Sequence, residues 1–308
     1  MKRLLTALYL GGNRFIGWLL ESVLAAVVPM PEHRVVPVFI VGAPRSGTTL
    51  VFQLLVTTFD FGYLTNLHCR AFGCPALVSY IRNQRQRESD FTSRYGRTLG
   101  WHGPSECGEW WYRFFSRDPV YATNKDVSAR SGAAFQRSLT LLAAAEGRPL
   151  IFKNLFASLR LEPIVREFPE AVFIHVRRGI RQNAQSILEG RKSSLGTYGA
   201  WWSVPPPGFE DLLQLSPVRQ VIAQIEMIDR QIVEDAERLG ISSRLISVKY
   251  EDVCAAPRDI VSKLEARFAA LGVDPARIGN PPSRFEISDE IRIPQPLYSE
   301  LVTLTEKD

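Results

Sequence analysis

The stretch VGAPRSGTTL, residues 41–50, follows an apolar run at residues 35–40 and precedes a helical pattern. Gly42 and Gly47 have the spacing of a Walker A loop, but Thr48 and Thr49 stand where that loop carries Lys and then Ser or Thr. Arg45 lies three residues before the position of the missing lysine. A glycine turn that opens a helix offers backbone N–H groups to a phosphate. The stretch therefore predicts a strand, a phosphate-binding turn and a helix, with Arg45 and the two threonines as added donors.

The rest of the chain alternates short β-rich runs with longer helical patterns, which is typical of a parallel sheet with crossover helices. Predicted strands cover residues 35–41, 61–65, 149–153, 171–176 and 244–249, and predicted helices cover residues 48–58, 127–145, 158–167, 181–189, 218–239 and 258–271. The polar segment 82–108 is interpreted as a loop or insertion. We expect an α/β fold with a P-loop-type parallel β-sheet flanked by helices, forming one domain over residues 31–308. Ligands of such folds bind at the carboxyl ends of the strands.

Composition excludes few function classes. Of 308 residues, 45% are hydrophobic and 22% are charged, as in ordinary globular proteins. The net charge of +5 suits an anionic ligand or an anionic membrane surface. The basic residues are scattered without a nucleic-acid-binding motif, so we expect no nucleic-acid partner. Four cysteines without zinc spacing predict no metal site and a reducing, cytoplasmic compartment.

Residues 1–30 form a separate, mostly apolar segment. Gly11, Gly12 and Glu21 interrupt it, so no stretch reaches the roughly 20 apolar residues that a spanning helix needs. One interpretation is an amphipathic helix lying peripherally on the inner face of the membrane, with Trp18, Phe15 and the basic Lys2-Arg3 pair as anchors. The other is a helix that packs on the protein's own core or on a homodimer partner. Sequence alone leaves both open.

A second motif is VFIHVRRGIRQNAQS, residues 172–186. A strand ends at Arg178, a turn follows at Gly179, and Ser186 comes eight residues after Arg178 on the next helix. This pairing resembles the 3′-phosphate element of the sulfotransferases that use 3′-phosphoadenosine 5′-phosphosulfate (PAPS). Ser46–Thr49, preceded by Arg45, resembles the 5′-phosphosulfate loop of the same family. Both motifs occur in the family's order, about 130 residues apart.

The resemblance extends from Val35 to about Leu271, and it is strongest to the carbohydrate and tyrosyl-protein branches. It implies PAPS as donor and 3′,5′-adenosine bisphosphate (PAP) as product, with Lys153, which ends the strand PLIFK, reaching the active site. It also implies Tyr250, at the end of the strand SVKY, beside the nucleotide, and a lid at residues 190–202. The implied donor-binding residues are Ala43, Pro44, Arg45, Ser46, Gly47, Thr48, Thr49, Arg178, Ser186 and Tyr250.

The resemblance does not supply the catalytic base. The cytosolic branch carries a His after the lysine, where this chain has Asn154 and Leu155, and the tyrosyl branch carries a Glu where this chain has Thr65. The remaining candidates are Glu109, Glu106, His68 and His102, and the first three are preferred in that order. Burial under a tryptophan would raise the pKa of such a carboxylate and make it a better base.

The expected reaction is metal-independent transfer of a sulfuryl group, with Arg45 and Lys153 supplying positive charge. Aromatic residues at 101–115 and 201–202 favour a carbohydrate, glycolipid or other amphiphilic acceptor bearing a hydroxyl or an amine. One alternative is a P-loop kinase, against which the missing Walker lysine argues. The other is a membrane-associated binding protein that keeps the fold and has lost its base.

Overall fold

The structure is a computed structural model of the 308-residue chain, and it describes residues 2–29, 31, 33–81, 89–92, 98–288 and 290–306. Part of the segment 82–108, predicted to be a loop or insertion, lies outside these residues.

A parallel four-stranded sheet forms the centre of the fold, and it confirms the predicted α/β class. Its strands are β1 (Val38–Val41), β2 (Ile151–Lys153), β3 (Val172–Arg177) and β4 (Leu245–Lys249), in the order β2-β1-β3-β4. Val38 of β1 lies opposite Ile151 of β2 and Val172 of β3. The carboxyl ends of all four strands therefore meet at one edge of the sheet.

The predicted strand at residues 61–65 is not formed. Gly62 makes only an isolated parallel bridge to Leu150, just before β2, although Phe61, Tyr63 and Leu64 are buried. Thr65 already caps the short helix α3 (Asn66–Arg70), accepting a hydrogen bond from His68 N, so the chain turns before a strand ladder can develop. These residues are apolar because they are buried beside β2, and that burial gave the segment a strand-like sequence pattern although it forms no hydrogen-bonded strand ladder.

Helices cover both faces of the sheet, since every residue of β1 is buried. Val38 and Ile40 pack against α2 (Thr48–Thr58) and α12 (Pro257–Ala270). Phe39 and Val41 face the larger core, built with α6 (Ala129–Glu146), α7 (Leu161–Glu167), α8 (Ile180–Leu195) and α10 (Pro217–Arg238). The predicted helix at 158–167 is split into the 3₁₀ turn η1 (Leu155–Leu159) and α7, because Pro163 has no N–H to continue the ladder.

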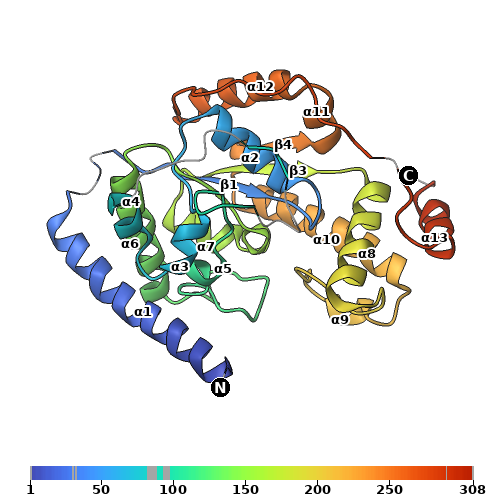
Figure 1. Cartoon of the computed structure of the whole chain (residues 1–308), viewed down its shortest axis with the longest axis horizontal. Helices are drawn as coiled ribbons and strands as arrows, with labels where there is room; N and C mark the ends of the chain where they lie inside the picture. The colour runs from blue at the N-terminus through green and yellow to red at the C-terminus, as the bar shows by residue number, and fades with distance from the viewer. Residues whose placement is uncertain are drawn as a thin grey trace.

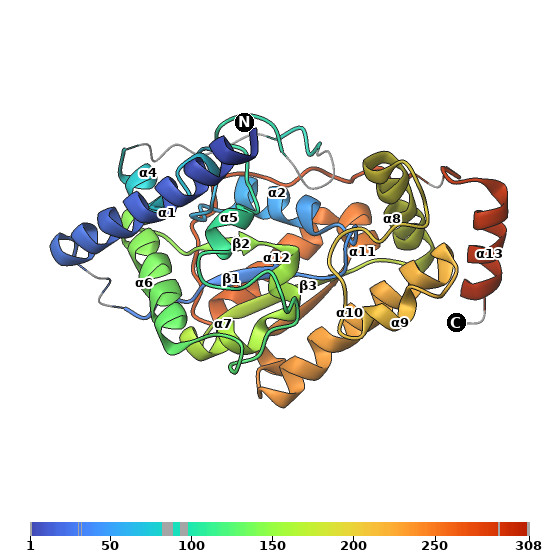
Figure 2. The same cartoon turned by 90° about the horizontal axis from the view of Figure 1, so that it is seen from below.

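The remaining helices lie around this core: α1 (Lys2–Val27), α4 (Pro75–Ile81), α5 (Gly108–Trp111), α9 (Phe209–Leu212), α11 (Tyr250–Ala255) and α13 (Gln295–Thr305), with the 3₁₀ turn η2 (Ser242–Arg244) before β4. The long helix α1 lies at the edge of the molecule beside α4 and α6 (Figures 1 and 2). Among the described residues, no helix is both long and apolar enough to cross a membrane.

Candidate active site

The loop between β1 and α2 has a backbone that its glycines make possible. Gly47 has φ +98°, and a Cβ there would lie 2.2 Å from Cδ2 of the Tyr250 ring. Arg45 also adopts a positive φ, 64°, which a residue other than glycine rarely does. Ser158 fixes the start of the loop, because its Oγ accepts from Gly42 N at 2.9 Å. The helix that follows has no side-chain cap at Gly47, so no capping side chain occupies its first N–H groups, which can receive an anion.

The turn between β3 and α8 holds this loop from the other side. Arg178 Nη1 donates to Arg45 O at 3.3 Å, and Arg45 Nε donates to Ser186 Oγ at 3.0 Å. The Asn183 amide, with its NH₂ turned to the loop, donates to Pro44 O at 2.8 Å. The two phosphate motifs predicted from the sequence are therefore in direct contact.

Lys153 lies at the carboxyl end of β2 with its side chain 3% exposed, and it forms an ion pair with Glu106. The backbone carbonyl of Glu106 accepts hydrogen bonds from Trp111 Nε1 at 3.1 Å and from Asn154 Nδ2 at 3.3 Å. Neighbouring groups of the core thus anchor the backbone of Glu106. Its carboxylate remains 30% exposed, facing the cavity described next.

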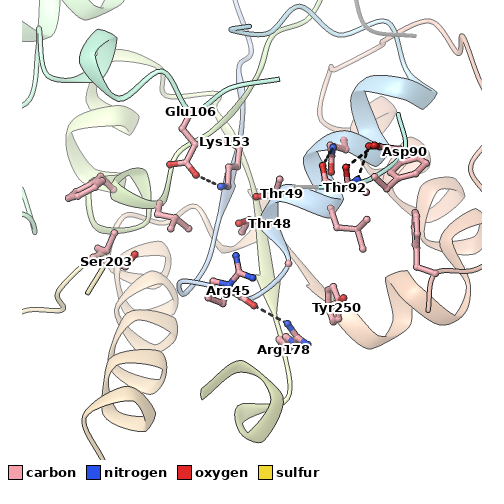
Figure 3. A pocket seen from close by; sticks show the side chains of 18 of the residues that line it. Arg45, Thr48, Thr49, Asp90, Thr92, Glu106, Lys153, Arg178, Ser203 and Tyr250 are labelled. Atoms are coloured by element: carbon pink, nitrogen blue, oxygen red, sulfur yellow. Dashed lines mark hydrogen bonds and ion pairs between the residues drawn. The ribbon is translucent and has the colours of Figure 1, made fainter. Parts of the chain in front are cut away.

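A cavity of about 680 Å³ joins these groups at the carboxyl edge of the sheet (Figure 3). Lys153 and Glu106 lie on one side of Thr48 and Thr49, and Tyr250 lies on the other side. The lining is formed by polar residues of the loop and strand ends together with aromatic and apolar side chains: Arg45, Gly47, Thr48, Thr49, Leu50, Gln53, Asp90, Phe91, Thr92, Glu106, Lys153, Leu155, Phe156, Arg178, Trp202, Ser203, Val204, Tyr250, Phe285 and Glu286.

Tyr250 closes the cavity beside the loop. The guanidinium of Arg178 lies over its ring, 4.4 Å from the centroid. Burial raises the pKa of Tyr250 to about 12, although the nearby Arg178 acts in the opposite direction. The phenol is therefore neutral at pH 7 and can donate a hydrogen bond.

Two of the three candidate bases lie away from the cavity lining. Glu109, the first preference from sequence, is held by Arg117 at 2.5 Å and Arg14 at 3.6 Å. His68 is buried, with Nδ1 2.7 Å from Thr65 Oγ1 and Nε2 3.0 Å from Ser79 Oγ. Of the three, only Glu106 lines the cavity.

Several donor-site candidates support the loop without lining the cavity. Ala43, Pro44 and Ser46 form its buried base, and Ser186 is 3% exposed beneath Arg45. Sequence reasoning missed Ser158, which carries no motif. It also missed Phe91 and Phe285, whose rings lie 4.9 Å apart, because the first lies in the segment interpreted as a loop and the second lies beyond the recognised motifs.

Two polar atoms of this site have no hydrogen-bond partner within the described part of the chain. They are the buried Oγ of Ser46, inside the loop, and Nε of Arg178. Ser46 lies in the buried base of the loop, whereas Arg178 lines the cavity. Buried polar groups are normally satisfied, so the unpaired Nε of Arg178 indicates a place where an anionic ligand can complete the site. The cations Arg45, Lys153 and Arg178 along the cavity fit a ligand that carries more than one anionic group.

Comparison with known proteins identifies the family. The profile described as the Sulfotransferase family matches residues 37–271. The chain belongs to the sulfotransferase family. It is accordingly a transferase, and its P-loop-type sheet is the nucleotide-binding framework of that fold.

Solved structures share this fold. Sulfotransferase STF9 from Mycobacterium avium superposes with a TM-score of 0.54 and 16% identity, covering 94% of this chain and 81% of its own. Sulfotransferase STF1 from Mycobacterium tuberculosis H37Rv gives a TM-score of 0.54 and 14% identity, covering 97% and 80%. At these identities the similarity supports the fold alone. No curated protein sequence matches the chain.

Proposed function

We propose that this sulfotransferase moves the sulfuryl group of PAPS to a hydroxyl of an amphiphilic acceptor such as a carbohydrate or glycolipid, without a metal ion. The observation that carries the proposal is the set of cations at the strand ends. Arg45 follows β1, Lys153 ends β2 and Arg178 follows β3, and all three line one cavity together with Glu106.

On the donor side, the loop and Thr48 and Thr49 would hold the 5′-phosphate through N–H and hydroxyl donors at the start of α2. Arg178 and Ser186 would hold the 3′-phosphate, which ATP does not have. When bound, PAPS would supply the sulfuryl group and leave as PAP. The unpaired Arg178 Nε supports this assignment, because Arg178 lines the cavity and this atom offers a hydrogen bond that the described part of the protein leaves unused.

On the acceptor side, Lys153 and Glu106 would act as a pair. The Lys153 ammonium can turn from Glu106 to negative charge developing at the loop, where a fixed cation is most effective. That movement would leave the Glu106 carboxylate to accept the proton of an attacking hydroxyl. We therefore replace the first preference from sequence, Glu109, with Glu106 as the proposed base.

The walls beside this pair favour an acceptor with an apolar part. Leu155, Phe156, Trp202 and Val204 line the same cavity as Lys153 and Glu106. Aromatic faces stack on sugar rings or cover alkyl chains, whereas a hydroxyl would be directed to Glu106. An amphiphilic alcohol satisfies both requirements.

Calorimetric titration with PAP in the absence of magnesium tests the donor assignment. We expect tight binding by the wild type, weak binding of ATP, and at least tenfold weaker PAP binding by Arg178→Ala. Arg177→Ala is the matched control, because Arg177 precedes Arg178 but lies 3.9 Å from Asp229 with its side chain 57% exposed. Magnesium-dependent ATP binding without PAP binding would overturn the proposal.

A further inference from the structure

Three polar groups of helix α1, the Tyr9 hydroxyl, the Asn13 amide and the Glu21 carboxylate, are bonded to the rest of the protein. Tyr9 Oη and Asn13 Nδ2 donate to Arg70 O at 2.7 and 2.8 Å, and Asn13 Oδ1 accepts from Gly73 N at 2.7 Å. Glu21 is 1% exposed and pairs with Arg113 at 2.5 Å. Surface helices of globular proteins have the opposite arrangement, with charged and polar residues toward solvent.

The outward side of α1 is correspondingly apolar. Its large exposed side chains range from 36% to 70% exposed: Leu4, Leu5, Leu8, Tyr9, Phe15, Ile16, Trp18, Leu19, Leu20, Val23 and Val27. Such a continuous apolar surface marks an interaction site, because monomeric soluble proteins rarely leave one uncovered. We call the outward side chains of these eleven residues the α1 apolar face.

The width of the α1 apolar face distinguishes a bilayer from a second protein copy. At 100° per residue, its members span an arc of roughly 200° around the helix axis. The seam through which one helix packs on another is much narrower, because it uses about two positions in seven. A helix lying in a lipid surface is instead surrounded by acyl chains on every side that the protein does not cover.

Arginines lie on both borders of this face. Arg14 projects from α1 beside it with its side chain 45% exposed, and it shares the single carboxylate of Glu109 with Arg117. On the other border, the backbone carbonyl of Arg70 accepts from Tyr9 Oη, and the Arg70 guanidinium lies over the ring of Trp101, 5.6 Å from its centroid. Cations and aromatic rings at the edges of an apolar face are what an anionic headgroup layer favours.

The neighbouring helix α4 extends the apolar surface. A groove of about 480 Å³ between the two helices is lined by apolar side chains that include Leu8, Ile16, Leu77 and Ile81. Ile81, at the end of α4, is 71% exposed. Both views place α1 and α4 at the periphery of the described part of the chain (Figures 1 and 2).

We propose that α1 lies in the plane of an anionic lipid bilayer, with the α1 apolar face among the acyl chains and Arg14, Arg70 and Arg117 at the headgroups. The inference does not depend on the donor or acceptor of the transfer reaction. It assigns the apolar face to lipid in preference to a dimer partner.

The test is flotation of the purified full chain with vesicles of phosphatidylcholine alone or of phosphatidylcholine mixed with phosphatidylglycerol. We expect binding to the mixed vesicles and at least a tenfold loss in the double variant Leu8→Glu/Leu19→Glu, whose sites lie near the centre of the α1 apolar face. Arg70→Gln should weaken binding to the mixed vesicles by about fivefold. Leu213→Glu is the matched control, because Leu213 is 46% exposed, as Leu19 is at 43%, but lies outside α1.

Folding is not expected to limit the test, since the substituted side chains are already exposed. Circular dichroism and the thermal midpoint should match the wild type, and PAP titration provides an independent measure of an intact core. Binding that is equal in the double variant and the wild type would refute the proposal. Failure of the wild type to bind either kind of vesicle would refute it as well. If the wild type were then a dimer that the double variant dissociates, the α1 apolar face would be assigned to a second copy of the chain.

Discussion

Replacement of Glu106 by Gln should separate donor binding from transfer. The substitution removes a negative charge that contacts Lys153 and faces a cavity built for anions. A charge several ångströms from a phosphate contributes on the order of 1 kcal/mol at the effective dielectric of a partly exposed site, so PAP should bind about fivefold tighter. Loss of a general base should lower turnover by roughly a hundredfold or more.

The same change should destabilise the fold modestly. Breaking a fully buried ion pair costs about 3–5 kcal/mol, and the Lys153 side chain that loses its carboxylate is only 3% exposed. The amide oxygen of the substituted side chain can still accept a hydrogen bond from the ammonium, so we expect about 1–2 kcal/mol. Thermal unfolding should therefore show a midpoint a few degrees lower, on the order of 2–4 °C per kcal/mol. The substituted protein remains folded, and its affinity and turnover can be measured.

Calorimetry with PAP gives the affinity, and sulfate transfer from radiolabelled PAPS to an acceptor found among hydroxylated amphiphiles gives the turnover. Glu109→Gln is the matched control, because Glu109 pairs with Arg14 and Arg117 outside the cavity lining. We expect it to leave both quantities unchanged. Unchanged turnover in Glu106→Gln, or weaker PAP binding, would refute the assignment of Glu106 as the base.

Three further changes probe the loop. Gly47→Ala should abolish PAP binding and cost about 2–4 kcal/mol of unfolding free energy, because φ at this position is +98° and the new Cβ would meet Tyr250. The control Gly196→Ala, at φ +74° in open space, should cost only about 1 kcal/mol. Thermal unfolding of the two variants compares these costs. Arg45→Lys should weaken PAP binding about tenfold in calorimetry, since lysine cannot reproduce the Nε bond to Ser186. The pKa of Tyr250 is raised from 10 to about 12, so its neutral form contributes stability that is present below pH 10 and is lost as the pH rises toward 12. In urea unfolding, Tyr250→Phe should therefore lose less unfolding free energy than the wild type between pH 10 and pH 12.

The sequence predicted the centre of the fold because its signals there are local. The apolar run before Gly42 and the helix from Thr48 are consecutive segments, and α2 has the predicted bounds of Thr48–Thr58. The sequence failed for residues 61–65, where the same apolar pattern reflects burial without strand pairing. Periodicity reports burial, whereas a strand also needs a hydrogen-bonded partner along its length.

The choice between Glu106 and Glu109 depended on one backbone angle. Cys107 between them has φ 45°, which turns the chain so that Glu106 faces Lys153 while Glu109 enters α5 and meets the arginines. Nothing in the letters SECGEWW indicates that a cysteine adopts this conformation. Glu106 therefore lines the cavity and Glu109 does not, and the role of Glu106 as the base stays a prediction.

The sequence also did not reveal which side of α1 faces the protein. The sequence places Asn13 and Glu21 in a mostly apolar segment, and it leaves open whether the apolar side of that helix meets a membrane, the protein's own core or a dimer partner. The structure turns both residues inward, because Arg70, Gly73 and Arg113 supply partners from distant segments. Which side of a helix is covered depends on these long-range partners.

The order of the strands explains how a phosphate loop functions without its own lysine. The sheet runs β2-β1-β3-β4, and the residues at the carboxyl ends follow in the same order: Lys153, the Arg45 loop, Arg178 and Tyr250. A Walker lysine would concentrate its charge at the loop, whereas here the charge is distributed over three adjacent strand ends. Under the proposed function, a ligand with a 5′-group at the loop and a 3′-phosphate at Arg178 would extend from β1 toward β4. Its reacting end would then face β2, where Lys153 and Glu106 lie, so the proposed donor and acceptor sides of the cavity follow the order of the strands.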